Sequence, residues 1–494
     1  MSDILTYLET QLATFDEEPF NAVDSALLAQ FCMARGEGIM PRVALGEEPP
    51  EEAKGEGAAH RRGPFAALRR RLRERREGGH GGKAVKAAKA GAATEALAET
   101  AAPAPGAATS AAPTSGAVPA PAPAAAPASA LAPAASVAVT PDAADRAEER
   151  QDATAPTTPI RFADLLRAEC FGTMFSGMHQ AQMKQQLFLM AASPRFRELL
   201  IYDHVAAFDE TLDMQFAATT FVDPGRFAYV GFRGTDTTLT GWREDFNMAY
   251  TVPVPAQDLA ARYVEAVAAD PRLPRDLLLG GHSKGGNLAE YAALTVTPAV
   301  QDRIAHLYNH DGPGFMPGTF SAADYAPLVG RMTKQVPEDS MVGILMESAM
   351  PTVTVKATGR GFEQHSVYRW EVADAAYSAA DATPTAFVTV PALPERTERR
   401  AEALDQWLAS MDGPTRKQMV DALFNALRAA GITDAAQLFE GGREWAILRD
   451  GVMKAPVADR TTMLNALRGL TRAFSDVTAA RNNARRAGLK RNGQ

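Results

Sequence analysis

The chain has 494 residues and a formal net charge of −8 at pH 7. This length predicts one to three domains, and the acidic balance argues against nucleic-acid binding by the chain as a whole. The two cysteines, Cys32 and Cys170, lie in no CxxC or Cys/His spacing, which argues against a disulfide framework and a zinc site. We therefore expect a protein of the cytoplasm that needs no metal or organic cofactor.

Residues 1–33 predict an ordered helical element. Apolar residues recur at helical spacing in residues 4–8 and 23–33, and Asp24 is a candidate cap of the second helix. The N-terminus has no basic region followed by an apolar run, so we expect no signal peptide. No window outside an alanine/proline tract reaches the roughly 18 apolar residues of a membrane-spanning helix.

Residues 34–158 predict a disordered linker. They pass from an acidic stretch to a strongly basic one, Arg61–Glu77, and then to a long tract of alanine and proline. Such a composition has too few large apolar side chains to offset the entropy lost on ordering. The basic stretch is interpreted as a solvated helical fragment. The alternative is contact between residues 61–76 and an anionic membrane or another acidic surface, and RNA is the least favoured partner.

Residues 159–393 predict an α/β domain. We expect helices at 162–192, 257–269 and 284–294, and strands at 216–222, 226–234, 276–281 and 352–358 and at the start of 304–314 and 331–340. Strands that alternate with helices favour a mainly parallel sheet with both faces covered.

Residues 394–494 predict a helical C-terminal region. In its first part Met419, Leu423, Leu427 and Ala430 share one helix face, and Gly431 is a candidate C-cap. A further helix is expected over residues 460–480, followed by a basic tail.

The stretch LLLGGHSKGGNLAEYAAL, residues 277–294, places Ser283 in a G-x-S-x-G motif between an apolar strand and a helix. The nucleophile of α/β-hydrolases lies at such a strand-to-helix turn. Gly281 and Gly285 allow the strand and the helix to approach closely, and the helix start favours negative charge on the serine oxygen. We expect Ser283 to be a nucleophile rather than a residue of an ordinary glycine-rich turn.

A serine nucleophile needs a base, and three histidines follow Ser283. His306 lies inside a predicted strand, which favours packing. His310 is too close to the serine to leave a separate strand for the acid before it. His365 follows a strand and lies in a loop, so it is the predicted base.

The third triad member is expected in a loop after a strand, between the serine and the base. Asp339 ends the second strand after the nucleophile helix and is the predicted acid. Asp311 ends the first such strand, where we expect it to fix a DGPG turn, and Glu338 is a lesser alternative. Asp302 and Asp324 have the pattern of solvated residues.

The oxyanion of an acyl transition state needs fixed donors. One is expected from the backbone N–H of Lys284, the residue after the nucleophile. The other is expected from Thr235, in the turn that follows the strand AYVGF. Arg233 and Asp245 are a candidate buried ion pair that would hold this turn.

These motifs resemble known families. FRGTDTTLTGWREDF (232–246) and GGHSKGGNLAEYAA (280–293) resemble blocks of class 3 lipases. A closer resemblance is to a bacterial family of lipase-like α/β-hydrolase proteins of unknown function. Its further blocks match residues 24–31, DGPGF at 311–315, DSMVG at 339–343, and a Gln-His pair before an aromatic residue at 364–370.

The resemblance covers residues 1–33 and 160–375 and omits the linker and the helical C-terminus. It implies an α/β-hydrolase fold with Ser283, Asp339 and His365 as the triad and with Thr235 and Lys284 at the oxyanion site. It also implies that the element 1–33 packs on the hydrolase core despite the long insert, which loop entropy tolerates.

The sequence says less about the substrate than about the type of reaction. Phe171, Met174, Phe175 and Met178 recur at helical spacing, which indicates core packing or, alternatively, a flexible apolar wall of an acyl pocket. We expect a serine esterase that acts on a small acyl or lipid-type substrate. A thioesterase, a peptidase and a catalytically dispensable scaffold or tethering protein are the alternatives.

Overall fold

The computed structural model describes residues 2–42, 155–373, 387–438 and 444–492. The predicted disordered linker lies outside these residues except at its two ends, and the basic stretch 61–76 lies wholly outside them. Residues 34–42 were predicted as linker, but they continue the ordered N-terminal element, with Ile39 and Met40 buried.

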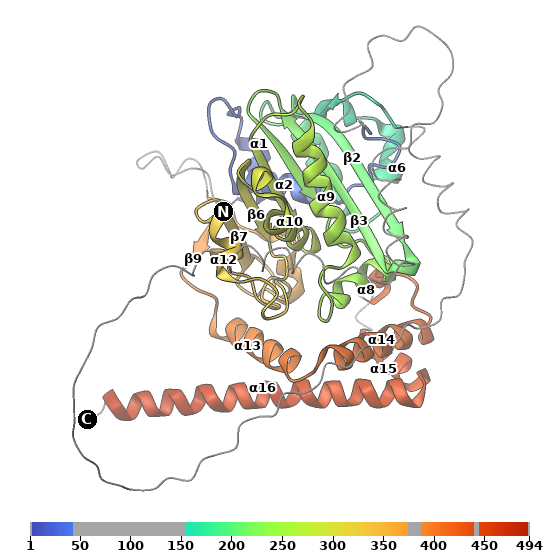
Figure 1. The fold of residues 1–494 in the computed structure, drawn as a ribbon, viewed down its shortest axis with the longest axis vertical. Helices are drawn as coiled ribbons and strands as arrows, with labels where there is room; N and C mark the ends of the chain where they lie inside the picture. Colours follow the sequence, from blue (N-terminus) through green and yellow to red (C-terminus); the bar gives the residue numbers. More distant parts are fainter. Residues whose placement is uncertain (1, 43–154, 374–386, 439–443, 493–494) are drawn as a thin grey trace, which may run out of the picture. The chain divides into compact units, whose positions relative to one another are not determined.

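In the described part of the chain, nine strands form one sheet in the order in which they occur in the sequence (Figure 1). The strands are β1 (Ile160–Arg161), β2 (Leu200–Asp209), β3 (Met214–Asp223), β4 (Phe227–Phe232), β5 (Leu277–His282), β6 (Ile304–His310), β7 (Met332–Pro337), β8 (Thr352–Val355) and β9 (Thr389–Val390). Strands β4 to β8 pair in parallel, while β1 to β4 and the pair β8–β9 are antiparallel. The mixed α/β class and the parallel centre agree with the prediction, whereas β1, β2 and β9 were not predicted.

The α-helices of the described residues are α1 (Ile4–Thr10), α2 (Ala22–Phe31), α6 (Phe171–Met174), α7 (Gln180–Ala192), α8 (Leu239–Asn247), α9 (Pro255–Ala269), α10 (Lys284–Thr295), α11 (Pro298–Gln301), α12 (Ala322–Tyr325), α13 (Glu395–Ala409), α14 (Gly413–Ala429), α15 (Glu444–Lys454) and α16 (Val457–Asn492). Short 3₁₀ segments are η1 (Phe162–Leu165), η2 (Ala168–Cys170), η3 (Glu210–Leu212), η4 (Ala326–Leu328), η5 (Gly361–His365), η6 (Val367–Arg369) and η8 (Ala435–Leu438). The single helix predicted over 162–192 is wrong. It is broken into four pieces, and His179 before α7 has a left-handed backbone with φ 56°.

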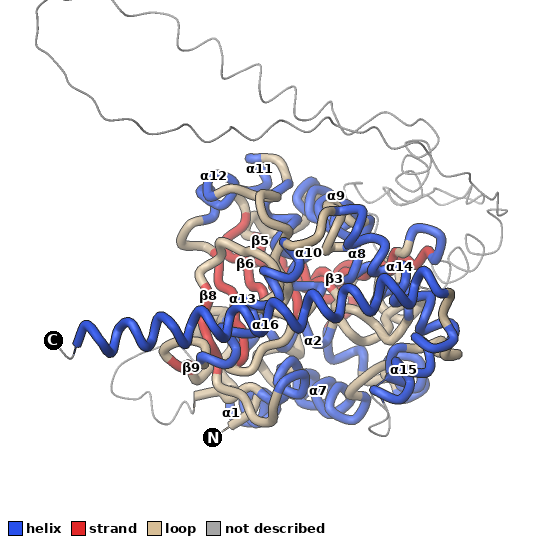
Figure 2. The backbone as a smooth tube through the Cα atoms, turned by 90° about the horizontal axis from the view of Figure 1, so that it is seen from below, coloured by secondary structure: helices blue, strands red, loops and turns tan. Residues whose placement is uncertain are grey.

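The strand order explains why the N-terminal element lies in the core. Crossovers between parallel strands are right-handed, so neighbouring strands taken in chain order place their connecting helices on one face of the sheet. Helices α9 and α10 contact each other and pack against that face. The opposite face is covered by α2, which contacts β4, β5 and β6, and by α7, which contacts α1 and α2 (Figure 2).

Helix α2 lies very close to the sheet. An added Cβ at Gly280 would come within 2.8 Å of Ser25 Oγ, so β5 needs a glycine there. Asn21, not Asp24, is the N-cap residue of α2, and Asp24 is the third residue of a capping box. The Asp24 carboxylate also forms a fully buried ion pair with Arg195, whose Nη2 lies 2.7 Å from Oδ2.

The two ends of the long insert meet in space. The backbone N–H of Arg42 donates to the carbonyl of Pro156 at 2.7 Å. The chain therefore leaves the ordered unit and returns to it at nearly the same point, which is the condition under which a long insertion leaves a fold undisturbed.

The C-terminal helices have an apolar contact of their own with the rest of the chain. Val420, Phe424 and Leu427 of α14 are buried in a cluster that includes Leu239 and Trp242 of α8. Helix α14 ends as predicted, because the glycine after its C-cap, at position 431, has φ 82°. Helix α16 extends beyond the predicted 460–480 at both ends.

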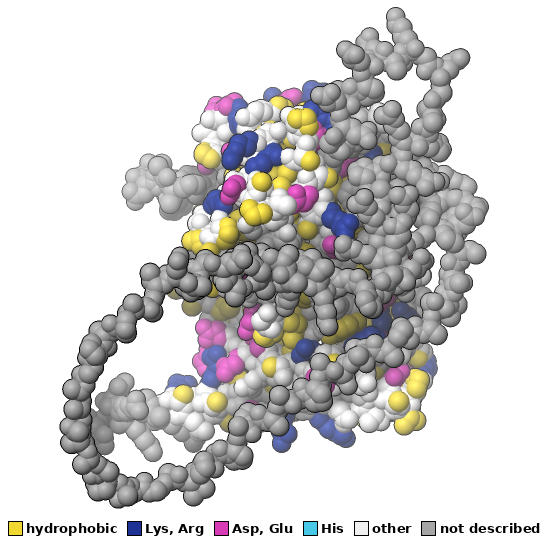
Figure 3. Space-filling model, in the orientation of Figure 1, with side chains coloured by type: hydrophobic (Ala, Val, Ile, Leu, Met, Phe, Trp, Pro, Cys, Tyr) yellow, Lys and Arg dark blue, Asp and Glu magenta, His cyan; other side chains and the backbone are white. Residues whose placement is uncertain are grey.

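Charged side chains of both signs lie among one another on the described surface seen in Figure 3, rather than in one block of a single sign. Among the described helices, none has both the length and the apolar content that crossing a membrane requires.

Candidate active site

Ser283 lies at a sharp corner between β5 and α10. Its backbone has φ 59° and ψ −131°, a conformation that residues with a side chain rarely adopt. The corner is tight, because an added Cβ at Gly281 would come within 2.2 Å of the carbonyl carbon of Gly285. The local geometry is therefore that of a strand-to-helix turn which holds a serine in a strained position.

The next parallel strand brings Asp311 beside this corner. The N–H of Ser283 donates to the carbonyl of His310, the last residue of β6, at 3.0 Å. Since β5, β6 and β7 run in the same direction, the residues that follow them lie along one edge of the sheet.

Asp311 is the carboxylate that contacts the predicted base. His365 Nδ1 donates to Asp311 Oδ2 at 2.6 Å, and the Asp311 side chain is fully buried. Its other oxygen, Oδ1, accepts from Ser340 Oγ at 2.6 Å and from the Gly343 N–H at 3.0 Å. These three donors fix the carboxylate, and the carboxylate in turn selects the tautomer of His365 that carries its proton on Nδ1.

The side chain of Asp339, the predicted acid, has partners other than His365. Asp339 Oδ1 accepts from Arg400 Nη2 at 2.9 Å, and Oδ2 accepts from the Gly361 N–H at 2.8 Å. Burial raises the pKa of Asp339, but these donors outweigh burial and hold the pKa below its ordinary value. Both aspartates end neighbouring strands, but Asp311 follows β6, the strand beside β5, whereas Asp339 follows β7, one strand further away.

His365 is held from its backbone as well as from its ring. His282, the residue before the serine, donates from Nε2 to the His365 carbonyl at 2.6 Å, and the two rings lie 4.5 Å apart between centroids. Burial lowers the pKa of His282 well below its usual range, so this ring is a neutral donor. The sequence did not predict this contact, although His282 is the first x of G-x-S-x-G.

The two atoms that are predicted to react have no competing partner among the described residues. Neither Ser283 Oγ nor His365 Nε2 makes a hydrogen bond there. Hydrogen bonds between nucleophile and base are often long before substrate binds, and they tighten in the complex.

The predicted oxyanion residues lie beside the corner. A Cβ built on Gly234 would be 3.4 Å from the Cβ of Ser283, so the turn with Thr235 is adjacent to the serine. In the described structure the backbone N–H groups of Thr235 and Lys284 donate to no other group. Thr235 Oγ1 instead donates to Asp245 Oδ2 at 2.5 Å, which fixes the turn.

The Lys284 side chain points into the interior and not toward the serine. Its Nζ donates to the Gln215 carbonyl at 2.8 Å and to Glu244 Oε2 at 3.0 Å, with both charged side chains almost fully buried. Burial raises the pKa of nearby Asp245 to about 6, against the lowering effect of Lys284. Lys284 Nζ lies 4.0 Å from Oδ1 of Asp245, the carboxylate that accepts from Thr235.

The expected ion pair between Arg233 and Asp245 is wrong. Arg233 donates to Glu37 Oε1 at 3.0 Å and to the carbonyls of Cys32 and Ala34 at 2.9 and 2.7 Å. Arg233, at the start of the turn that follows β4, therefore anchors the N-terminal element to the sheet.

Three of the four residues that recur at helical spacing after η2 contact the core, and Met178 is only half-buried. Met174 and Phe175 are buried in the cluster that contains α1, α2 and α7, and Phe171 packs against it. Core packing, rather than an open apolar wall, describes Met174 and Phe175 in this structure.

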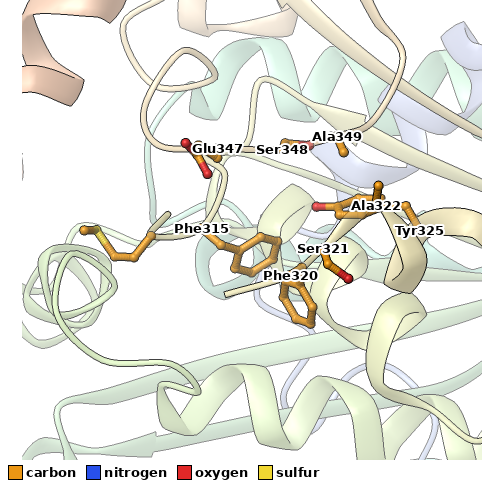
Figure 4. A pocket seen from close by; sticks show the side chains of 9 residues that line it. Phe315, Phe320, Ser321, Ala322, Tyr325, Glu347, Ser348 and Ala349 are labelled. Atoms are coloured by element: carbon orange, nitrogen blue, oxygen red, sulfur yellow. The ribbon is translucent and has the colours of Figure 1, made fainter. Parts of the chain in front are cut away.

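A pocket of about 290 Å³ lies on the flank of the DGPGF loop (Figure 4). Its lining includes Phe315, Phe320, Tyr325 and Glu347, and none of the three candidate triad residues. In the described ranges, no group of three or more His, Cys, Asp or Glu side chains is arranged to hold a metal ion.

Comparison with known proteins gives one family match. The family model described as Mbeg1-like matches residues 190–425, which include the serine corner, Asp311, His365 and α13. The match relates this part of the chain to lipase-like proteins. It extends further toward the C-terminus than the predicted limit of 375, and it does not include residues 1–33 and 160–189, which the predicted resemblance covers. No curated protein matches the chain.

One solved structure, the crystal structure of M37 lipase, aligns at 14% identity with a TM-score of 0.23. The alignment covers 35% of this chain and 65% of the lipase chain. A TM-score of this size does not show a shared fold.

Proposed function

We propose that the chain is a serine hydrolase that cleaves an ester bond through an acyl-enzyme, on an α/β-hydrolase fold. Ser283 is the nucleophile, His365 the general base, and Asp311 the acid that orients the base. The observation that supports this most directly is the 2.6 Å hydrogen bond between His365 Nδ1 and the buried Asp311 carboxylate, at the sheet edge where a strained serine ends β5.

The arrangement supports a complete reaction. Ser283 Oγ attacks the carbonyl carbon of the ester while His365 Nε2 takes its proton, and Asp311 stabilises the imidazolium that results. The backbone N–H groups of Lys284 and Thr235 donate to the developing oxyanion. His365 then gives the proton to the leaving alkoxide, and water, activated by the same imidazole, releases the carboxylic acid product and restores the serine.

An acyl ester is the substrate class that we propose. Its support is the relation of residues 190–425 to the Mbeg1-like family, together with the backbone N–H groups of Thr235 and Lys284, unpaired among the described residues, in the segments beside Ser283. Thioesters and amides react through the same intermediates, so a panel of ester, thioester and amide substrates separates these classes.

The test is covalent labelling of the full chain with a fluorophosphonate probe. The wild type is expected to label at one site, and Ser283→Ala is expected not to label. Absence of labelling, together with no turnover of p-nitrophenyl esters of any chain length, would contradict the proposal and favour a scaffold or tethering role.

A further inference from the structure

The loop from Glu338 to Gly343 contacts both the acid and the base of the proposed triad. On the acid side, Ser340 Oγ and the N–H of Gly343 both donate to Asp311 Oδ1. These are the only side-chain and backbone donors that this oxygen has among the described residues, so the loop sets the position of the Asp311 carboxylate.

On the base side, the same loop holds η5, the short segment that ends at His365. Asp339 Oδ2 accepts from the N–H of Gly361 at 2.8 Å, and the N–H of Asp339 donates to Gln364 Oε1 at 2.7 Å. Gln364 in turn donates to the carbonyl of Ala357 at 3.0 Å. The loop is thus bonded to both ends of η5.

Helix α13, which comes later in the chain, forms hydrogen bonds to this loop. Thr397 Oγ1 donates to the Glu338 carbonyl at 2.6 Å. Arg400 Nη1 donates to the Ser340 carbonyl at 3.0 Å, and its Nη2 donates to Asp339 Oδ1 at 2.9 Å. The Arg400 guanidinium therefore bonds both Asp339, which contacts η5, and Ser340, which contacts Asp311.

We propose that Arg400 is a positioning residue of the active site, through which α13 keeps Asp311 and His365 in register with Ser283. This inference depends on the proposed function, since it assigns the C-terminal helical region a part in that reaction. The family match ends at residue 425, so α13 lies within the matched region, whereas α15 and α16 lie beyond it.

The energetics favour such a role. An exposed ion pair contributes little, but the Asp339 side chain is 8% exposed and that of Arg400 is 21% exposed. A planar guanidinium forms two directed, charge-assisted hydrogen bonds here, and a lysine cannot reproduce both. Loss of Arg400 removes bonds from the loop without removing any group that touches the substrate.

The experiment compares Arg400→Met and Arg400→Lys with Arg399→Met in the full chain. Arg399 is the neighbouring residue on α13 and makes no hydrogen bond or ion pair with the described residues, so it is the matched control. Ester kinetics and the fluorophosphonate labelling rate report on reactivity. Hydrogen exchange of the peptide 357–370 reports on η5, whatever the activity.

We expect Arg400→Met to lower kcat and the labelling rate roughly 10- to 100-fold, with KM within about 2-fold, because misplacement of a catalytic group by about 1 Å has effects of this size. Exchange in 357–370 is expected to rise. Arg400→Lys should recover part of the rate, and Arg399→Met should match the wild type.

Wild-type labelling and exchange in Arg400→Met would overturn the inference, and so would faster exchange with unchanged labelling. If Arg400→Met does not fold, Thr397→Val weakens the attachment of α13 to the same loop at a second point, since it removes the bond to the Glu338 carbonyl. A wild type that never labels would instead contradict the proposed function, and the exchange data would then decide separately whether Arg400 holds η5.

Discussion

Asp311 and His365 are 54 positions apart in the sequence and are joined by a hydrogen bond of 2.6 Å between Oδ2 and Nδ1. The bond links the end of β6 to the end of η5, two segments that flank the serine corner. Because Asp339 contacts Gly361 and Arg400 instead, the two aspartates are expected to have separable effects on catalysis.

Asp311→Asn is expected to lower kcat by about 10,000-fold, because an amide cannot hold the imidazole in the tautomer that accepts the serine proton. Asp339→Asn keeps an oxygen that accepts from Arg400 or from Gly361, so we expect a loss of about 10-fold, in the range of a positioning effect. Turnover of a p-nitrophenyl ester by each variant measures both. An equal or larger loss in Asp339→Asn would show that the acid is misassigned.

Ser283→Gly and Ser283→Ala are expected to differ in stability, although neither can be labelled. At φ 59° and ψ −131° a side chain is strained, and relief of that strain is worth on the order of 1–3 kcal/mol. We therefore expect the glycine variant to unfold at a free energy about 1 kcal/mol higher than the alanine variant, the reverse of their usual order. Urea unfolding gives the comparison. The usual order, alanine above glycine, would mean that the corner is relaxed.

Replacement of residues 43–154 by about eight Gly/Ser residues is expected to leave the ester rate unchanged and to raise the free energy of unfolding by up to about 2 kcal/mol, because a shorter loop costs less to close. The design relies on the contact between Arg42 and Pro156. In contrast, deletion of residues 1–42 uncovers the sheet face beneath α2 and should give aggregated protein. Chemical unfolding measures the stability of the short-linker protein, and size-exclusion chromatography detects aggregation of the protein that lacks residues 1–42. Failure of the short-linker protein to fold would assign the insert a structural role.

His204 is expected to make the protein less stable in mild acid. Burial lowers the pKa of His204 from its usual 6.5 to about 3, so below pH 6.5 the unfolded chain binds a proton that the native state does not. The free energy of unfolding then falls as the pH falls, by about 1.4 kcal/mol per pH unit for this one group. His204→Gln should reduce the slope between pH 4 and 6 by that amount.

The matched control for that measurement is Thr219→Val. It removes the 2.9 Å hydrogen bond between Thr219 Oγ1 and His204 Nδ1 but leaves the histidine in place, so the pH slope should stay close to that of the wild type. Parallel slopes for His204→Gln and the wild type would show that the imidazole is not buried in its neutral form.

The serine corner could be predicted because all of its determinants are local. The corner consists of an apolar strand, glycines two positions on either side of Ser283, and a helix, which follow one another directly in the chain. Strands β3 to β8 could be predicted for a similar reason, since each has its own local apolar pattern. The local sequence does not contain the information that decides between Asp311 and Asp339. Both end strands before His365, and only the order of those strands in the sheet and the path of η5 decide which carboxylate reaches the ring.

Other errors have the same origin. The expected pair of Arg233 and Asp245 joins two residues that are near in sequence. The partners of Arg233 instead lie in residues 32–37, which the fold brings back from the far side of the insert. Strand β2 was missed, although β3 beside it was predicted. The contact of α13 with the loop at Ser340 could not be predicted, since it depends on an arginine within a helix whose partner face is set by tertiary packing.

The position of α2 also has a consequence for synthesis of the chain, because α2 is made long before the strands that cover it. Ser25 in this helix contacts Tyr229 of β4, 204 positions later in the chain. At translation rates of about 5–20 residues per second, the apolar surface of α2 emerges roughly 10–40 seconds before the strands that cover it. Until then the nascent chain exposes an apolar helix at the ribosome exit. Chaperone protection is therefore needed early in synthesis rather than at its end.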